Sequence, residues 1–329
     1  MALPVYASPL ERVWHVTYKV ICALIFLFLI APILIIIPLS FNAEPYFTFS
    51  QKMLSLDPTG YSMRWYGELV TVGMQKPEAT GMAFWSDFWQ NSTWLNVAKN
   101  SVIIGFFSTI LATFLGTLAA LGLARSEMPW RSAIMAVLIS PMIVPIIISA
   151  TGMFFFFANP GIPYPVVSFS PFGVGLDFFS FKEHFGFILA KTYLGVIMAH
   201  AALGIPFVII TVTATLIGFD QSLARAAASL GANPRTTFFK VIMPLILPGV
   251  ISGALFAFVS SFDEVVAVLF IGGHDQQTIP RQMFNGLREQ ISPAILAAAT
   301  LLVIISIALL ATVEVLRRRS ERLRGLSPR

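Results

Sequence analysis

The stretch ARAAASLGANPRTTFFKVIMPLILPG, residues 224–249, lies between two long apolar stretches of the chain. Its first half consists mostly of small, polar and basic residues, and Gly231 and Pro234 interrupt it. A helix of about ten residues before Gly231 would be about 15 Å long, too short to cross a bilayer. We expect Asp220 to cap its start and Gly231 to end it in a left-handed conformation. Pro234 keeps the helix from resuming directly, so a second helix is predicted from near Arg235.

One face of this short helix is apolar and has small side chains at its centre. Leu223, Ala226, Ala227 and Leu230 fall at helical spacing on that face. Alanines permit close backbone approach, which suits insertion into a groove of another protein. A helix lying on the membrane surface would normally show bulky apolar side chains there, so docking is the favoured interpretation.

The composition indicates a membrane protein. Of the 329 residues, 57% are hydrophobic, 11% are charged and 30 are Phe, whereas soluble domains carry about 25% charged residues. The formal charge of +5 is therefore no sign of nucleic-acid binding. The single cysteine, Cys22, excludes an intrachain disulfide and gives no metal or redox signal.

The predicted fold is all-α and polytopic, with one membrane domain and no internal repeat. Six apolar stretches meet the length of roughly 20 residues that a transmembrane helix needs: 20–43, 100–124, 131–157, 187–218, 244–271 and 291–316. They divide the chain into an N-terminal segment 1–19, the first span, a loop 44–99, a five-helix core 100–316 with a loop at 219–240, and a tail 317–329.

Six spans place both termini on the same side of the membrane. The tail, the short loop 123–131 and the opening stretch are rich in Arg and Lys, so the positive-inside rule makes that side cytoplasmic. The loop 44–99 falls on the other side. It mixes basic with acidic residues and is rich in Trp and Tyr, which predicts a partly helical segment at the outer interface.

Prolines inside two spans predict kinks. Pro141 and Pro145 lie in the third span and Pro206 in the fourth, and each removes a backbone hydrogen bond of its helix. Kinks suit a gate, but they are also common in ordinary membrane helices.

Polar residues inside the spans are candidates for a substrate path. Asp263 and Glu264 are adjacent carboxylates within the fifth span, where a lone charge should face a wet cavity or a cation. Alternatively, they pair with a base such as Arg281 or contact a partner subunit. His200 in the fourth span is a secondary candidate, since a lone membrane histidine more often makes an interhelical hydrogen bond. Phe262 could add a cation–π contact to an amine, although packing is the commoner role of such a ring.

The opening stretch resembles a motif of the membrane subunits of bacterial ABC importers: E-A-A, three residues, G, nine residues, I, one residue, L-P. Every spacing is kept, but Arg225 stands in place of Glu, Val241 in place of Ile and Met243 in place of Leu. In that family the helix docks into the ATPase. The resemblance thus implies ATPase coupling through the following residues: Arg225, Ala226, Ala227, Leu230, Gly231, Pro234 and Pro244.

Further segments are similar to the spermidine/putrescine-type permease subunits of that family. They are SFDEVVAVLFIGG (261–273), TIP (278–280), AHAALGIPFVIITV (199–212), NSVIIGFFSTILATFLGTLAALGLAR (100–125) and GYSMRWY (60–66). The resemblance implies a type I importer permease in the bacterial inner membrane. It would work with two ABC ATPase subunits, a second homologous permease and a periplasmic substrate-binding protein.

The chain has no G-x-x-x-x-G-K-[ST] loop, zinc spacing or nucleophile elbow. We therefore expect no cofactor and no catalysis in this chain, with ATP and Mg²⁺ bound by the partner ATPase. The predicted cargo is a polyamine or related small amine. One alternative keeps the architecture but carries GABA, an opine or another amino-acid-like compound. Another is a self-contained secondary transporter, which would often show inverted repeats.

Overall fold

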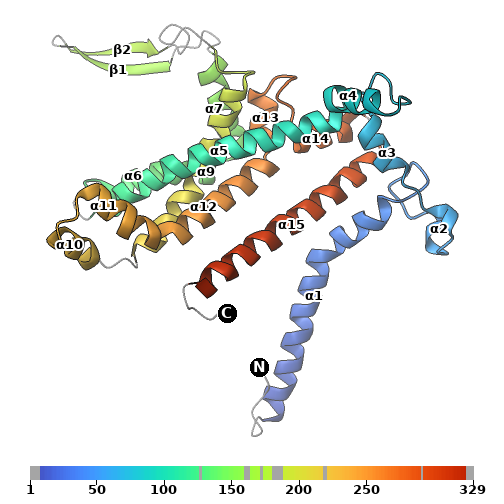
Figure 1. The fold of residues 1–329 in the computed structure, drawn as a ribbon, viewed down its shortest axis with the longest axis horizontal. Coiled ribbons are helices and arrows are strands. Elements are labelled where there is room, and N and C mark those ends of the chain that lie inside the picture. The colour runs from blue at the N-terminus through green and yellow to red at the C-terminus, as the bar shows by residue number, and fades with distance from the viewer. Residues whose placement is uncertain are drawn as a thin grey trace. The chain divides into compact units, whose positions relative to one another are not determined.

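The computed structural model describes residues 8–125, 128–158, 164–170, 173–179, 188–217, 221–289 and 292–323. The chain forms two compact units (Figure 1). Unit 1 contains Met1–Thr93 and Asn285–Arg329, and unit 2 contains Trp94–Phe284. The predicted cap Asp220 lies outside the described residues.

Unit 1 is built on the long helix α1 (Pro9–Leu39). It starts well before the predicted span because Ser8 and Glu11 form a reciprocal capping box at its N-terminus. The predicted partly helical loop follows, and Trp65 anchors it by donating a hydrogen bond from Nε1 to the Asn42 carbonyl oxygen at 2.6 Å. The other helices of the unit are α2 (Gln51–Leu54), η1 (Pro58–Gly60), α3 (Arg64–Thr71), α4 (Met82–Asn91) and α15 (Ala294–Leu323), which packs on α1 and α3.

Unit 2 holds most of the buried core. Its elements, in chain order, are α5 (Thr93–Leu123), α6 (Arg131–Ile143), α7 (Ile146–Ala158), β1 (Tyr164–Ser170), β2 (Gly173–Phe179), α9 (Tyr193–Ile217), α10 (Gln221–Ser229), α11 (Pro234–Thr237), the π-helical turn η2 (Phe238–Ile242), α12 (Met243–Asp263), α13 (Val266–Ile271) and the first half of α14 (Ile279–Glu289). The most extensive packing between helices in the unit is that of α9 against α12.

Helices α5, α9 and α12 contact one another along small residues spaced four positions apart in the sequence. We call this contact region the seam. On α12 these are Gly249, Gly253 and Ala257; a Cβ added at Gly249 would lie 2.6 Å from Thr215 Oγ1 on α9. Gly204 on α9 lies between Ala257 and Ala112, the latter on α5. Small residues let helix backbones approach closely, the usual basis of helix association in lipid.

Two predicted spans are interrupted. The third bends by 102° between α6 and α7, at Pro145, which confirms the predicted kink there. The fifth was predicted to be continuous over 244–271 but breaks after Asp263, because Glu264 adopts an extended backbone with ψ 123° and α13 starts afresh. By contrast, α9 continues through Pro206 as one helix.

Four described helices are long and apolar enough to cross a membrane: α1, α5, α9 and the run Pro234–Asp263. The bent pair α6–α7 makes a fifth span if it is counted as one. The apolar part of α15 in the described part of the chain, Ala294–Ala308, is shorter than a full span. The sixth span therefore stays a prediction.

One hairpin in this predominantly helical chain was not predicted from the sequence. Strands β1 and β2 pair antiparallel from Tyr164↔Phe179 to Ser170↔Gly173. The strands are rich in Val and Phe, which favour a pleated backbone. Figure 1 shows them beyond the end of α7.

Candidate functional site

The α10 segment is a short helix with a sharply defined end. Gly231 has φ +84°, as predicted. Its N–H donates to the Ala228 carbonyl oxygen at 2.9 Å, and the Ala232 N–H donates to the Ala227 carbonyl oxygen at 3.0 Å. These two bonds form a Schellman motif, which satisfies carbonyls that the helix end would otherwise leave open.

The apolar face of α10 is largely free of its own chain. Leu230 is 89% exposed and Leu223 is 45% exposed, and Ala226 is also exposed. Ala227 is half-buried because α10 contacts α11 and η2. An exposed face of this kind can enter a groove on another protein.

A short capped turn and a π turn link α10 to α12. Asn233 caps α11 by accepting a 2.8 Å hydrogen bond from the Thr236 N–H, and its extended backbone agrees with the predicted effect of Pro234. The helix then passes through η2 into α12. A wider π turn fits the position, because Pro244 cannot donate a backbone hydrogen bond and its ring crowds the preceding turn.

The break at the end of α12 separates the two candidate carboxylates. Asp263 is the last residue of α12 and is exposed. Glu264 is half-buried, and its Oε1 accepts a 2.9 Å hydrogen bond from the Ala267 N–H at the start of α13. Glu264 thus has a local capping role, whereas Asp263 is exposed at the end of α12.

The predicted base Arg281 does not pair with these carboxylates. Asp263, Glu264 and Arg281 all lie in the described part of the chain, and no ion pair joins them. Nη1 of Arg281 instead donates to the carbonyl oxygens of Val268, Gly272 and Gly273, at 3.1, 3.1 and 2.8 Å. Arg281 therefore closes the end of α13.

His200 is buried in the seam and makes the interhelical hydrogen bond typical of a lone membrane histidine. Its Nδ1 lies 2.8 Å from Ser261 Oγ on α12, and Ser261 Oγ lies 2.9 Å from Ser108 Oγ on α5. His200 is 1% exposed, and no described atom bonds its Nε2. One polar layer thus joins three helices next to the break that carries Asp263.

Phe262 lies beside that break and stacks on Phe258, with ring centroids 5.7 Å apart and planes 26° apart. This contact supports the packing interpretation of Phe262. Among the described residues, no group of His, Cys, Asp and Glu could hold a metal ion.

A polar cluster at the opposite end of unit 2 from α10 was not predicted. The Tyr193 hydroxyl donates to Asn100 Oδ1 at 2.8 Å and lies 2.9 Å from the Asp275 carbonyl oxygen. Asn100 Nδ2 donates to the carbonyl oxygens of Asp275 and Gln277 at 2.8 and 2.9 Å. These bonds hold the loop after α13 to the first turns of α5 and α9. They join residues far apart in sequence, so no local pattern could reveal them.

The long apolar helices, with the exposed α10 between two spans, define a polytopic membrane protein. Residues 112–323, more than half of the chain, match the model of the binding-protein-dependent transport system inner membrane component family. The chain belongs to this family.

Two relatives that match over about nine tenths of their length are named as polyamine permeases. The spermidine/putrescine transport system permease protein PotC of Haemophilus influenzae is 28% identical over 296 residues, covering 90% of this chain and 94% of PotC. The putrescine transport system permease protein PotI of Escherichia coli is 28% identical over 301 residues, covering 91% and 88%. The molybdenum transport system permease protein ModB of Mycobacterium bovis is also 28% identical, but over 61% of this chain and 71% of ModB.

A solved structure shares the fold. One chain of a bacterial ABC transporter involved in the import of alginate superposes with a TM-score of 0.61 at 15% identity. The match covers 94% of this chain and 99% of that one.

Proposed function

We propose that this chain is a permease subunit of an ATP-driven importer of polyamines. The observation that carries the proposal is its match, over about nine tenths of its length, to permeases named for spermidine and putrescine. A second, homologous permease, two ABC ATPase subunits and a periplasmic binding protein would complete the importer. Both termini and α10 would lie on the cytoplasmic side of the bacterial inner membrane, and ATP hydrolysis would occur in the partner ATPase.

Asp263 is the residue we assign to the cargo. It is exposed at a break in a membrane helix, where backbone carbonyls at the C-terminal end add a negative field. A polyamine carries ammonium groups that such a site attracts. Glu264 is held by α13, so it would shape the break, while His200 and Phe262 would support it from the seam.

Coupling to the ATPase is the role we assign to α10 and its end at Gly231. Leu230 and Ala226 would enter the ATPase groove beside Ala227, and Arg225 would lie at its edge. Pro234 and Pro244 would keep the connection to α12 stiff. Closure of the ATPases would then move α12 and open the path past Asp263.

The cargo assignment is tested by uptake of labelled spermidine and putrescine into proteoliposomes holding the assembled complex. Asp263→Asn should lower uptake about tenfold, the effect of losing one charge-assisted bond of roughly 1.5 kcal/mol. Glu264→Gln should have less effect, since an amide oxygen can still accept from Ala267. The control is Asp275→Asn, an exposed carboxylate in the loop after α13. Equal uptake by Asp263→Asn and the control would refute the assignment.

The coupling assignment is tested by cross-linking. Cys22 is the only cysteine of the chain, so Ala227→Cys on a Cys22→Ser background places a single thiol on α10. A short cross-linker should capture the ATPase from the assembled complex. A thiol at Ser252 of α12 is the control and should not capture it. Failure at position 227 in an active complex would exclude docking through α10.

A further inference from the structure

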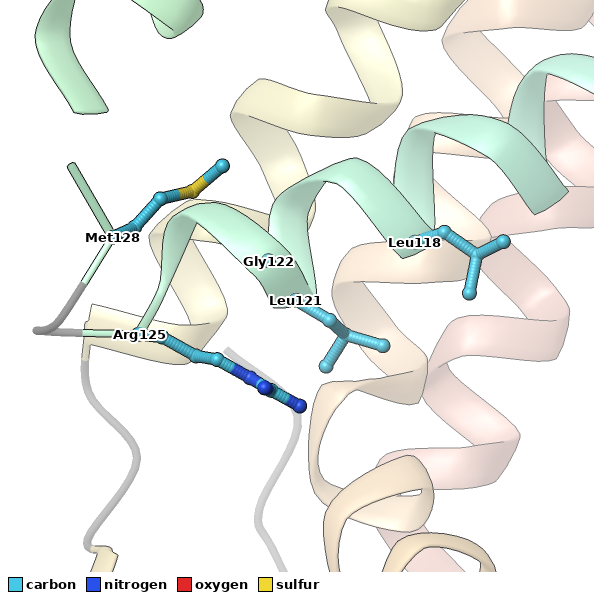
Figure 2. Close-up of a pocket in the computed structure, with 5 residues that line it drawn as sticks. All are labelled: Leu118, Leu121, Gly122, Arg125 and Met128. Carbon is cyan, nitrogen blue, oxygen red and sulfur yellow. The ribbon is translucent and has the colours of Figure 1, made fainter. Parts of the chain in front are cut away.

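The last turn of α5 borders a cavity that the importer mechanism does not use. It has a volume of about 550 Å³ and is lined by Leu118, Leu121, Gly122, Arg125 and Met128, the residues of what we call the Arg125 cavity. Figure 2 shows Leu118, Leu121 and Arg125 extending to the same side of α5.

Backbone hydrogen bonds hold Arg125 and Met128 at the end of α5. The Arg125 N–H donates to the Gly122 carbonyl oxygen at 3.2 Å, and the Met128 N–H donates to the Arg125 carbonyl oxygen at 3.3 Å. These turns bring Met128 beside the end of α5. Gly122 leaves the wall open, since a Cβ added there would meet no atom within 4 Å.

The cavity is amphipathic. Leucine and methionine side chains form its apolar part, and Arg125 supplies a permanent positive charge. Arg125 is exposed, and no described carboxylate forms an ion pair with it. A cation at the end of a membrane helix next to an apolar wall matches an anionic headgroup joined to acyl chains.

We propose that the Arg125 cavity binds an anionic phospholipid. The guanidinium pairs with the lipid phosphate through its two-pronged donor geometry, and Leu118 and Leu121, which extend to the same side of α5 as Arg125, contact the first part of an acyl chain. Basic pockets at the cytoplasmic ends of membrane helices are known to hold acidic headgroups. The cavity lies at the end of unit 2 that carries α10, because α5 and α9 both begin at the Asn100–Tyr193 cluster and α10 follows α9. A lipid bound there would stabilise the end of α5 on the side of unit 2 that carries α10.

The test uses native mass spectrometry of the full complex in detergent, titrated with phosphatidylglycerol or with phosphatidylcholine of the same acyl chains. The wild type should prefer phosphatidylglycerol. Arg125→Gln should weaken phosphatidylglycerol binding about fivefold, as expected for about 1 kcal/mol per basic residue near a lipid surface, and should remove the preference. The matched control, Arg131→Gln, removes an exposed arginine at the start of α6 that does not line the cavity. This variant should keep both the binding of phosphatidylglycerol and the preference for it.

A second pair of variants tests the cavity rather than the charge. Gly122→Leu fills the open space without backbone strain and should displace the bound lipid while Arg125 remains. Gly152→Leu introduces the same side chain at an equally open position on α7 and should leave binding unchanged. A folded Gly122→Leu variant that binds phosphatidylglycerol normally would overturn the proposal.

One further outcome would also overturn it. Inorganic phosphate that competes with the lipid at equal concentration would mean that a free anion occupies the site.

Discussion

In the seam, α9 and α12 bring small side chains into close contact, whereas most described side chains of α10 are exposed. Gly253 and Gly249 leave no room for a Cβ, because Thr211, Val208 and Thr215 occupy that space. Gly231 at the end of α10 has nothing within 4 Å of an added Cβ. Glycine is therefore needed for close helix approach in the seam and for backbone conformation in α10. The first region is suited to holding the membrane helices together and the second to meeting a partner.

The largest expected effect is that of a bulky residue in the seam. Gly253→Leu forces α9 and α12 apart and should destabilise the protein by about 1–3 kcal/mol, the usual cost of overpacking. Thermal unfolding and the yield of inserted protein measure this. Gly152→Leu on α7, where the space is open, should be nearly neutral. Equal losses in the two variants would mean that the close contact at Gly253 contributes nothing specific.

The next effect separates conformation from space at Gly231. Gly231→Val strains a left-handed backbone by about 1–2 kcal/mol without any steric contact, so the protein should insert normally. Uptake should fall about tenfold while ATP hydrolysis by the complex continues, because the end of α10 is displaced. Gly231→Asn should recover most of the uptake, since Asn tolerates this conformation. Normal uptake by Gly231→Val would contradict the coupling role.

These two glycines also show what the sequence can reveal. The end of α10 depends only on Gly231, Asn233 and Pro234, which are neighbours in the chain, so its conformation was predicted correctly. The residues that contact Gly253 lie on another helix, and the sequence around Gly253 does not indicate which residues they are. The importer-permease fold was predicted from the order of motifs shared with a known family, and interactions between neighbouring residues alone would not have indicated it.

The candidate carboxylates show the same limit. Their presence in the membrane was visible in the sequence, but the break that divides their roles was not. It is accompanied by a cap that Glu264 makes to Ala267 and by the carbonyls in and just after α13 that Arg281 binds. An interhelical hydrogen bond of His200 was expected, but its partner Ser261, and the bond from Ser261 to Ser108, were equally hidden, since the three residues come from three helices. The role of Asp263 in transport stays a prediction.

A smaller effect is expected from the polar layer of the seam. Ser261→Ala removes the hydroxyl that joins His200 to Ser108 and should lower stability by about 0.6 kcal/mol, the average found for hydrogen bonds between membrane helices. Thermal unfolding in one detergent gives the comparison. Ser252→Ala, at an exposed position of α12, is the matched control. A loss no greater than that of the control would show that close packing alone stabilises the seam.

The smallest effect should come from charge reversal on α10. Arg225 is exposed, so it would act on the ATPase only through a solvated contact, and such pairs contribute about 0.2–1 kcal/mol. Arg225→Glu, which introduces the residue usual in the related motif, should change uptake by no more than about fivefold, and less at high salt. Uptake by Arg225→Glu and by Gly231→Val is measured at two ionic strengths. The comparison shows whether the charge of Arg225 or the conformation at Gly231 matters more for uptake. If Arg225→Glu lowered uptake more than Gly231→Val, the ATPase contact would depend on that charge rather than on the shape of the helix end.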